Sequence, residues 1–345
     1  MSEKPPASIL FASEAGANQL VAGVPAAARA LLLATENAKK NGDIAIAVPG
    51  GWKPSEYCQM EAKRLAGDGE WKTADTHEIN RDDAVWAIDL LGVKPDENEQ
   101  NREAEIQALK QASKAIIAST GKAADGIVSR YINRPISQSI SRIMLRASWT
   151  RPGHATALAA LIGLAMVIAL LFGGATGLLI GAVLFQAASI VDGVDGEMAR
   201  ATQRSSERGA MLDSLTDAAT NLGFLAGVSF NVWQQGMERA AAAGAVACIV
   251  LGLGSALLGI VARRSGGPFT FDALKHKMRA KPSRFKQALV YIAMRDFYAL
   301  AACIAILVGA VVPLLYAFAI IACGWFLVVC VTFATNRFAP PSAES

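Results

Sequence analysis

The sequence predicts an α-helical membrane protein with six transmembrane helices, preceded by a small soluble α/β domain. The 345-residue chain is 53% hydrophobic, yet most of its acids fall within residues 1–150, and residues 155–336 are largely long apolar runs. Runs of about 20 apolar residues are long enough to cross a bilayer as helices. We therefore expect an α/β domain at 1–95, a linker helix and an amphipathic juxtamembrane helix at 96–150, a six-helix membrane domain at 151–337 and a tail at 338–345.

Short apolar runs alternate with helix-forming segments at the start of the chain. Ile9–Phe11 and Ile44–Val48 are typical of buried strands. Helices are expected at Pro25–Lys39, from Pro54 to about Ala66, and at Asp83–Leu91. This alternation predicts a small α/β domain over roughly residues 6–93.

The segment Leu20–Pro25 resembles the V-x-G-x-P segment of nucleotidyltransferases. Such enzymes also need a Gly-rich, basic loop just upstream to hold the triphosphate. Here that loop, Ser13–Asn18, holds one glycine and one acid, and no Lys or Arg occurs between Lys4 and Arg29. We expect a shortened, non-catalytic relative of these enzymes, although an unrelated small α/β domain would also account for the sequence.

Two further helices are expected before the membrane domain. Asp96–Ile117 has its acids early and its lysines late, which suits the helix dipole and predicts an exposed linker helix. A following segment has arginines on one side and an apolar face on the other, which predicts an amphipathic helix on an anionic membrane surface. The apolar face consists of Ile136, Ile140, Ile143, Met144 and Ala147.

Long uncharged stretches predict the membrane spans. The first four are expected at Ala155–Gly174, Thr176–Val191, Gly209–Asn231 and Ala240–Ala262. The fifth is expected to begin near Val290, and Gly309–Pro313 would turn the uncharged stretch Phe297–Asn336 into a fifth and a sixth.

Basic residues predict the orientation of these spans. They crowd the connection between spans four and five and the loop after span two, whereas the opposite loops together hold only Arg239. By the positive-inside rule, both termini and the loop after span two face the cytoplasm. We therefore expect an integral protein of the inner (cytoplasmic) membrane.

Four carboxylates lie near the ends of two apolar helices. Asp192 and Asp195 are spaced i,i+3, and Asp213 and Asp217 are spaced i,i+4, so each pair shares a helix face. Bare carboxylates are costly at a membrane, and oxygen-bound divalent cations are the simplest relief. Mg²⁺ held in this way usually also acts on a phosphate.

Small residues and an arginine accompany the acids. Gly196 and Ala199 each lie one turn beyond an aspartate on the same face, which leaves room for a ligand against the backbone. Arg200, with its fixed fork of donors, suits a pyrophosphate.

Together these residues form the pattern D-x2-D-G-x2-A-R-x8-G-x3-D-x3-D, from Asp192 to Asp217. Every fixed position matches the signature of the CDP-alcohol phosphotransferase (CDP-alcohol phosphatidyltransferase) family, which the chain thus resembles. The segment from Asp125 to Ser137, DG-x-VSRY-x-NRP-x-S, is similar to the inositol branch of that family, the di-myo-inositol phosphate phosphate synthases. Those proteins often carry an N-terminal cytidylyltransferase domain.

The resemblance implies an enzyme that transfers a substituted phosphate from a CDP-alcohol to an alcohol acceptor and releases CMP. It implies Mg²⁺ or Mn²⁺, with two ions, and a homodimer in the lipid bilayer. The implied metal ligands are Asp192, Asp195, Asp213 and Asp217, and Asp217 is also the implied catalytic base. The implied nucleotide-binding residues are Gly196, Ala199, Arg200 and Gly209.

The acceptor is less determined by sequence. Arg263, Arg264 and Arg295 are candidates to bind a phosphate on an acceptor such as an inositol phosphate, but contact with lipid headgroups would also explain them. The donor could instead be CDP-diacylglycerol, as in phosphatidylinositol phosphate or phosphatidylglycerol phosphate synthases. A function of another class, an intramembrane cation transporter, would place acids near the middle of several spans, whereas here they cluster at one end. No nucleic-acid partner is expected.

Overall fold

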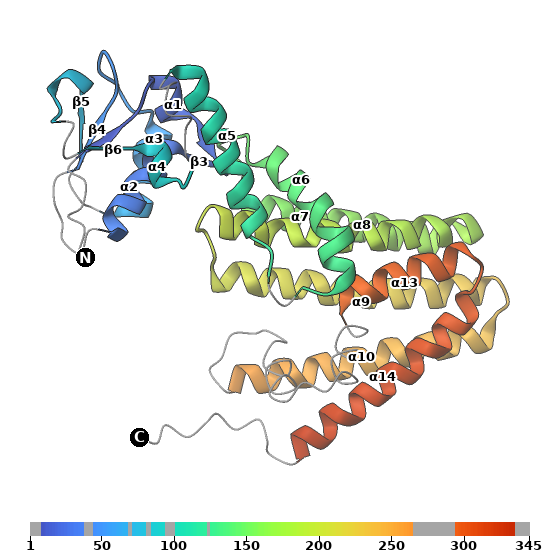
Figure 1. Cartoon of the computed structure of the whole chain (residues 1–345). Coiled ribbons are helices and arrows are strands. Elements are labelled where there is room, and N and C mark those ends of the chain that lie inside the picture. Colours follow the sequence, from blue (N-terminus) through green and yellow to red (C-terminus); the bar gives the residue numbers. More distant parts are fainter. Residues whose placement is uncertain are drawn as a thin grey trace. The chain divides into compact units, whose positions relative to one another are not determined.

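The computed structural model describes residues 8–37, 44–67, 71–80, 84–93, 101–122, 125–264 and 294–334 (Figure 1). The chain forms two compact units, which are described separately. The first comprises Met1–Gly121, Gln138–Arg151 and Glu197–Arg204. The second comprises Lys122–Ser137, Pro152–Gly196 and Ser205–Ser345.

A four-stranded parallel sheet forms the framework of the first unit, with strand order β5-β4-β1-β6. The strands are β1 (Ser8–Leu10), β4 (Ile44–Ala47), β5 (Trp71–Ala74) and β6 (Ala84–Trp86). A small hairpin of β2 (Leu20–Val21) and β3 (Val24–Pro25) lies outside this sheet. The predicted α/β domain and its first two strands are therefore confirmed, whereas β5, β6 and the hairpin were not predicted.

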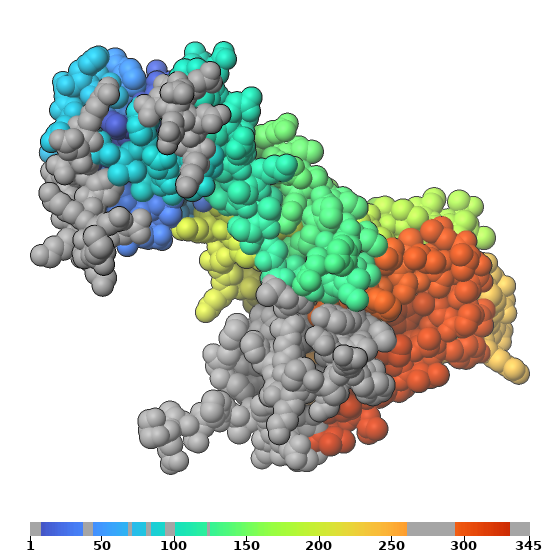
Figure 2. Space-filling model, viewed as in Figure 1, coloured from blue at the N-terminus to red at the C-terminus, as the bar shows by residue number. Residues whose placement is uncertain are grey.

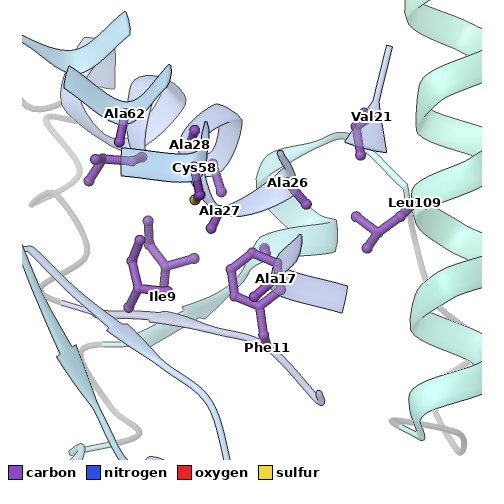
Figure 3. Packing of buried hydrophobic residues seen from close by; sticks show 14 of the residues in the cluster. Ile9, Phe11, Ala17, Val21, Ala26, Ala27, Ala28, Cys58, Ala62 and Leu109 are labelled. Carbon is purple, nitrogen blue, oxygen red and sulfur yellow. The ribbon is translucent and has the colours of Figure 1, made fainter. Parts of the chain in front are cut away.

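Helices complete this unit and surround its apolar core. They include α1 (Glu14–Asn18), α2 (Ala26–Asn37), the 3₁₀ turn η1 (Thr76–Glu78), α3 (Glu56–Ala66), α4 (Ala87–Leu90) and α5 (Arg102–Ser119). Figure 3 shows Ile9 and Phe11 facing the alanines of α2 and Cys58 of α3, with Leu109 of α5 on another side. Small alanines let α2 pack closely, and burial of the thiol raises the pKa of Cys58 to about 11. This free, buried cysteine is therefore a packing residue.

Two predicted helices differ from the structure. Asp83–Leu91 was predicted to be one helix, but its described part forms strand β6 and then the short helix α4, because Ala84–Trp86 pairs with β1. The helix predicted at Asp96–Ile117 exists as α5, but it is not an exposed linker. Its apolar side, with Ala108, Leu109 and Ala112, is buried in the core of the first unit.

The loop that would hold a triphosphate in a nucleotidyltransferase is occupied by the chain itself. Ser13 caps α1, and a carboxylate from α5 lies against this turn: Glu105 accepts hydrogen bonds from the Ala12 N–H at 2.7 Å and from the Ser13 hydroxyl at 2.9 Å. A Cβ at position 16 would overlap this carboxylate. Burial raises the pKa of Glu105, although these hydrogen bonds oppose the shift.

We predict that the full-length protein will not make CDP-alcohols from CTP, because the loop lacks basic residues and Glu105 uses its donors. A phosphate would meet a carboxylate there and would be repelled. The measurement is release of pyrophosphate from CTP in the presence of a sugar phosphate or an inositol phosphate. Pyrophosphate release above that of a protein-free control would contradict the prediction.

Helix α6 (Arg134–Met144) follows the π-helical turn η3 (Ser129–Asn133) and is amphipathic as predicted. Its buried side is made of small polar residues, Ser137 and Ser141, whereas Ile136 and Ile143 are exposed. An exposed apolar face beside arginines suits the predicted membrane surface.

The second unit is built from long helices. These are α7 (Pro152–Phe172), α8 (Gly174–Ala201), α9 (Glu207–Gln234), α10 (Glu238–Arg264), α13 (Arg295–Leu307) and α14 (Val311–Ala334). Helix α9 packs against α7 and α10, and α10 packs against α14. In the core, the Phe185 and Phe224 rings stack with centroids 3.9 Å apart, and Asn231 donates hydrogen bonds to the Leu170 and Gly174 carbonyls at the turn between α7 and α8.

Four of the described helices are long and apolar enough to cross a membrane: α7, α8, the Glu238–Ile260 part of α10, and the Val311–Val331 part of α14. Helix α9 is 28 residues long but carries acids, and α13 has 13 described residues. The structure therefore supports a membrane protein, but it does not confirm the predicted count of six spans. The expected start of span five near Val290 lies outside the described residues.

The outer faces of these helices are apolar. Leu161 on α7 and Ile320 on α14 are 62% and 74% exposed, and the atoms of α13 and α14 form one broad face (Figure 2). Such surfaces are expected in contact with lipid, where exposed apolar side chains carry no cost.

Candidate metal centre and donor site

The two halves of the aspartate pattern lie on two helices. Asp192 and Asp195 occupy the last turns of α8, and Asp213 and Asp217 occupy the first turns of α9. Ser206 caps α9, and its hydroxyl oxygen accepts a hydrogen bond from the Gly209 N–H at 3.1 Å. This cap fixes where α9 begins and hence which face carries its aspartates.

Three of the four aspartates converge. Each of Asp192, Asp213 and Asp217 contributes a carboxylate oxygen, and these oxygens all lie within 4.8 Å of one another. All three residues are half-buried. Partial burial strengthens both their mutual repulsion and their attraction for a cation.

The fourth aspartate has a different neighbour. Asp195 is only 8% exposed, and its Oδ2 accepts a hydrogen bond from the Thr156 hydroxyl on α7 at 2.6 Å. It does not belong to the group of converging oxygens. Its predicted role as a metal ligand stays a prediction, and a carboxylate can hold a hydroxyl with one oxygen while the other faces a cation.

Arg295, at the first turn of α13, forms ion pairs with two of the converging carboxylates. Its Nη1 lies 2.9 Å from Asp192 Oδ1, and the same guanidinium is paired with Asp217. The Arg295 side chain is 13% exposed, so this positive charge is largely shielded from water. The predicted acceptor residue is therefore placed beside the predicted catalytic base.

The neighbouring acid has a structural role. The Asp296 carboxylate accepts a hydrogen bond from the Ser129 N–H at 2.7 Å, and Gly126 packs closely against Met294 and Asp296. Asp296 thus attaches the segment before α6 to the start of α13, so its place next to Arg295 gives no independent support for an acceptor phosphate. The side chains of Arg263 and Arg264 lie outside the described residues.

The predicted nucleotide-binding residues divide between the two units. Gly196 and Gly209 belong to the second unit, and Ala199 and Arg200 belong to the first. Among the described residues, a Cβ at position 209 would come near the Ser206 hydroxyl alone. In the first unit, Arg200 Nε donates to the Thr120 carbonyl at 2.8 Å.

The residues fit a divalent cation. Carboxylate oxygens are the ligands that Mg²⁺ and Mn²⁺ prefer, and three of them already converge. Three carboxylates and one arginine leave a net charge of about −2 in a partly buried place, which a divalent cation would balance.

Comparison with known protein families identifies the family of the segment that carries these aspartates. The model of the CDP-alcohol phosphatidyltransferase family matches residues 149–330, more than half of the chain. The chain belongs to the CDP-alcohol phosphatidyltransferase family. The match contains α7, α8 and α9, and therefore all four aspartates of this CDP-alcohol phosphatidyltransferase.

Curated relatives carry the name bifunctional IPC transferase and DIPP synthase. The protein of Thermococcus kodakarensis is 29% identical over 201 residues, which are 57% of this chain and 44% of the relative. That of Archaeoglobus fulgidus is 34% identical over 119 residues, 34% of this chain and 23% of the relative. That of Rubrobacter xylanophilus is 37% identical over 138 residues, 40% of this chain and 30% of the relative. The chain thus spans less than half the length of each of these relatives, and the predicted likeness to the inositol branch is confirmed.

Sequence reasoning missed several polar contacts. Asp125 pairs with Arg134 at 2.8 Å, and Ser141 donates to the fully buried Glu197 at 2.6 Å. Asp125 and Arg134 lie in the segment that resembles the inositol branch, and Glu197 lies inside the aspartate pattern. The sequence patterns therefore contained these residues, but they did not show which residues would bond to one another.

Proposed function

We propose that the protein transfers a substituted phosphate from a CDP-alcohol to an alcohol acceptor and releases CMP, with metal dependence, in inositol phosphodiester synthesis. The observation that carries the proposal is the convergence of Asp192, Asp213 and Asp217 from both halves of the family pattern. The names of the relatives, transferase and synthase, support the reaction class, and the resemblance of residues 125–137 to the inositol branch supports the substrate class.

Asp192, Asp213 and Asp217 would hold the metal, with Asp195 as a further ligand. When bound, divalent cations would supply positive charge to the phosphate oxygens and to the departing CMP. Asp217 accepts the proton of the acceptor hydroxyl as the acceptor oxygen bonds to the β-phosphorus. The bond from this phosphorus to the oxygen of CMP breaks, and CMP leaves with the electron pair. Arg200, Gly196, Ala199 and Gly209 bind the cytidine diphosphate part of the donor.

The proposal also includes the location, orientation and assembly of the protein. We propose the inner (cytoplasmic) membrane as its location, with both termini and the site on the cytoplasmic side and a homodimer as the assembly; the four apolar helices support a membrane location, and the distribution of basic residues supports the orientation. CDP-alcohols that dissolve in the cytoplasm then reach the site directly.

The decisive experiment follows CMP release by the purified protein with a panel of donors: CDP-inositol, CDP-glycerol and CDP-diacylglycerol, each with inositol, an inositol phosphate or glycerol phosphate as acceptor. We expect release with CDP-inositol and an inositol phosphate, and loss of release when EDTA is added. Release with CDP-diacylglycerol alone would support a phosphatidyltransferase instead. No release with any donor would contradict the proposed reaction.

We predict that Arg295→Ala will raise the KM for an inositol phosphate acceptor. A charge-assisted hydrogen bond to a phosphate contributes roughly 1.5–3 kcal/mol, so the KM should rise about tenfold to a hundredfold. The exposed Arg239→Ala, at the first turn of α10, is the matched control and should leave the KM unchanged.

An unchanged acceptor KM in Arg295→Ala, or equal use of free inositol and its phosphate, would contradict this role. Arg295 would then serve only to neutralise Asp192 and Asp217, with which it is paired.

A further inference from the structure

We propose that two arginines of the α/β domain, Arg29 and Arg64, are positioning residues for the transferase: they hold the C-terminal end of α8 and thereby orient Arg200 toward the donor. The inference rests on the proposed function for the role of Arg200. All residues that carry it belong to the first unit, which contains both the α/β domain and residues 197–204.

Helix α8 ends in a strained turn. Its last hydrogen bonds form a Schellman motif, in which the Arg204 N–H donates to the Ala199 carbonyl at 2.8 Å and the Gln203 N–H donates to the Arg200 carbonyl at 3.3 Å. The motif requires a left-handed residue, usually glycine, and here Gln203 takes that conformation with φ of 53°. A side chain at this position makes the turn less stable than glycine would.

The α/β domain supplies the donors that this turn lacks. The carbonyls of Ala201, Thr202 and Gln203 come after those used by the motif itself. Arg29 Nη2 donates to Ala201 at 2.7 Å, and Arg64 donates to Thr202 through Nη2 at 2.7 Å and to Gln203 through Nη1 at 2.9 Å. Cations that bind the last carbonyls of a helix also interact favourably with its dipole.

The two arginines are themselves held in place. Arg29 is only 7% exposed and donates through Nε to the Val21 carbonyl, in the segment that resembles V-x-G-x-P. Burial and, next, the nearby Arg64 lower the pKa of Arg29 to about 10, so it stays charged at neutral pH. Arg64 donates through Nε and Nη2 to Glu61, whose other oxygen is paired with Arg204.

The hairpin turn of the domain packs against the same end of α8. Gly23, with φ of 82°, lies so close that an added Cβ would come within 2.6 Å of Leu145 and 3.2 Å of Thr202. Its carbonyl accepts a hydrogen bond from the Tyr57 hydroxyl at 2.8 Å. The segment that resembles V-x-G-x-P thus contacts the C-terminal end of α8.

The contacts between the first unit's arginines and the end of α8 lie next to Arg200, the proposed donor-binding arginine. Arg200 lies one residue before the first carbonyl that the domain holds, and its own Nε donates to the Thr120 carbonyl at the end of α5. Backbone and side chain of Arg200 are therefore both fixed by this domain. A residue fixed in its binding geometry loses less conformational entropy when the donor binds, and this favours affinity.

The test uses full-length protein in lipid nanodiscs and two measurements on Arg64→Ala: hydrogen exchange of peptides that cover residues 197–206, and donor and acceptor KM from CMP release. We expect faster exchange in these peptides and a donor KM about tenfold higher, because charge-assisted hydrogen bonds are lost, with acceptor KM and kcat within about twofold of wild type. Arg64→Lys should behave like the alanine variant, because an ammonium group cannot reproduce the guanidinium fork. The exposed Arg102→Ala on α5 is the matched control and should change neither measurement.

A second variant separates a positioning role from general damage. Gln203→Gly relieves the strain of the turn, so the double variant Arg64→Ala, Gln203→Gly should recover slow exchange and most of the donor affinity. Unchanged exchange or an unchanged donor KM in Arg64→Ala, or a double variant that recovers neither, would overturn the inference. If wild type releases no CMP from any CDP-alcohol, the proposed function has failed, and unchanged exchange in Arg64→Ala would separately show that the arginine does not hold the turn.

Discussion

Asp217→Asn is expected to abolish turnover while it largely spares the binding of metal and nucleotide. The amide has nearly the shape of the carboxylate, but it cannot accept the proton of the acceptor hydroxyl. Loss of a general base lowers the rate by about 10²–10⁴-fold. Arg295 remains paired with Asp192 in this variant, so the cluster keeps a cation–carboxylate pair and the fold should persist.

The measurement is CMP release in a single turnover at saturating donor and acceptor, together with titrations of CDP and Mg²⁺ binding. Asp89→Asn, an exposed position on α4, controls for the chemical change and should have the wild-type rate. An essentially wild-type rate in Asp217→Asn would remove this residue as the base. A rate loss explained entirely by weaker Mg²⁺ binding would make it a ligand only.

Local spacing allowed the centre of the site to be predicted. Acids three and four residues apart on a helix share a face, so the sequence predicted that four carboxylates could meet a common cation, and three of the four converge. Convergence of Asp192 with Asp213 and Asp217 also needs the end of α8 to lie near the start of α9, and the short connection between the two helices favours this. These two arguments needed no tertiary information.

Partners far apart in the chain could not be predicted in this way. Thr156 binds Asp195 across 39 residues, and Glu105 binds Ala12 across 93 residues. Nothing in the local pattern of either segment states which other segment will lie beside it. The same limit explains α5: its charge order predicted a helix, but the burial of Leu109 depends on a sheet whose outer strands the pattern did not reveal.

The predicted count of six membrane spans is not confirmed, for a different reason. Helix α9 combines the length of a span with the acids of the site, so hydropathy alone does not place it among the spans. A functional site placed at a helix end lowers the apolar signal of that helix, and the criterion that finds ordinary spans then excludes it.

Asp213→Asn is expected to raise the Mg²⁺ concentration needed for half-maximal activity by at least about tenfold. Asp213 is the converging aspartate for which no ion pair with Arg295 is found among the described residues, so its charge is the one most available to an incoming cation. Replacing one charged oxygen ligand by a neutral amide reduces the negative charge of the cluster from about −2 to about −1, and this weakens its attraction for Mg²⁺ at short range.

The dependence of Tm on Mg²⁺ concentration tests metal binding separately from turnover. A ligand that binds only the folded state stabilises it by RT ln(1 + [L]/Kd), so Mg²⁺ should raise the Tm of wild type, and a similar rise in Asp213→Asn should require about tenfold more Mg²⁺. Asp213→Glu keeps the charge and should respond to Mg²⁺ more like wild type than the asparagine variant does. Equal Mg²⁺ dependence of activity and of Tm in wild type and Asp213→Asn would show that Asp213 does not bind the metal. The converging aspartates would then function through their pairing with Arg295 rather than through a cation.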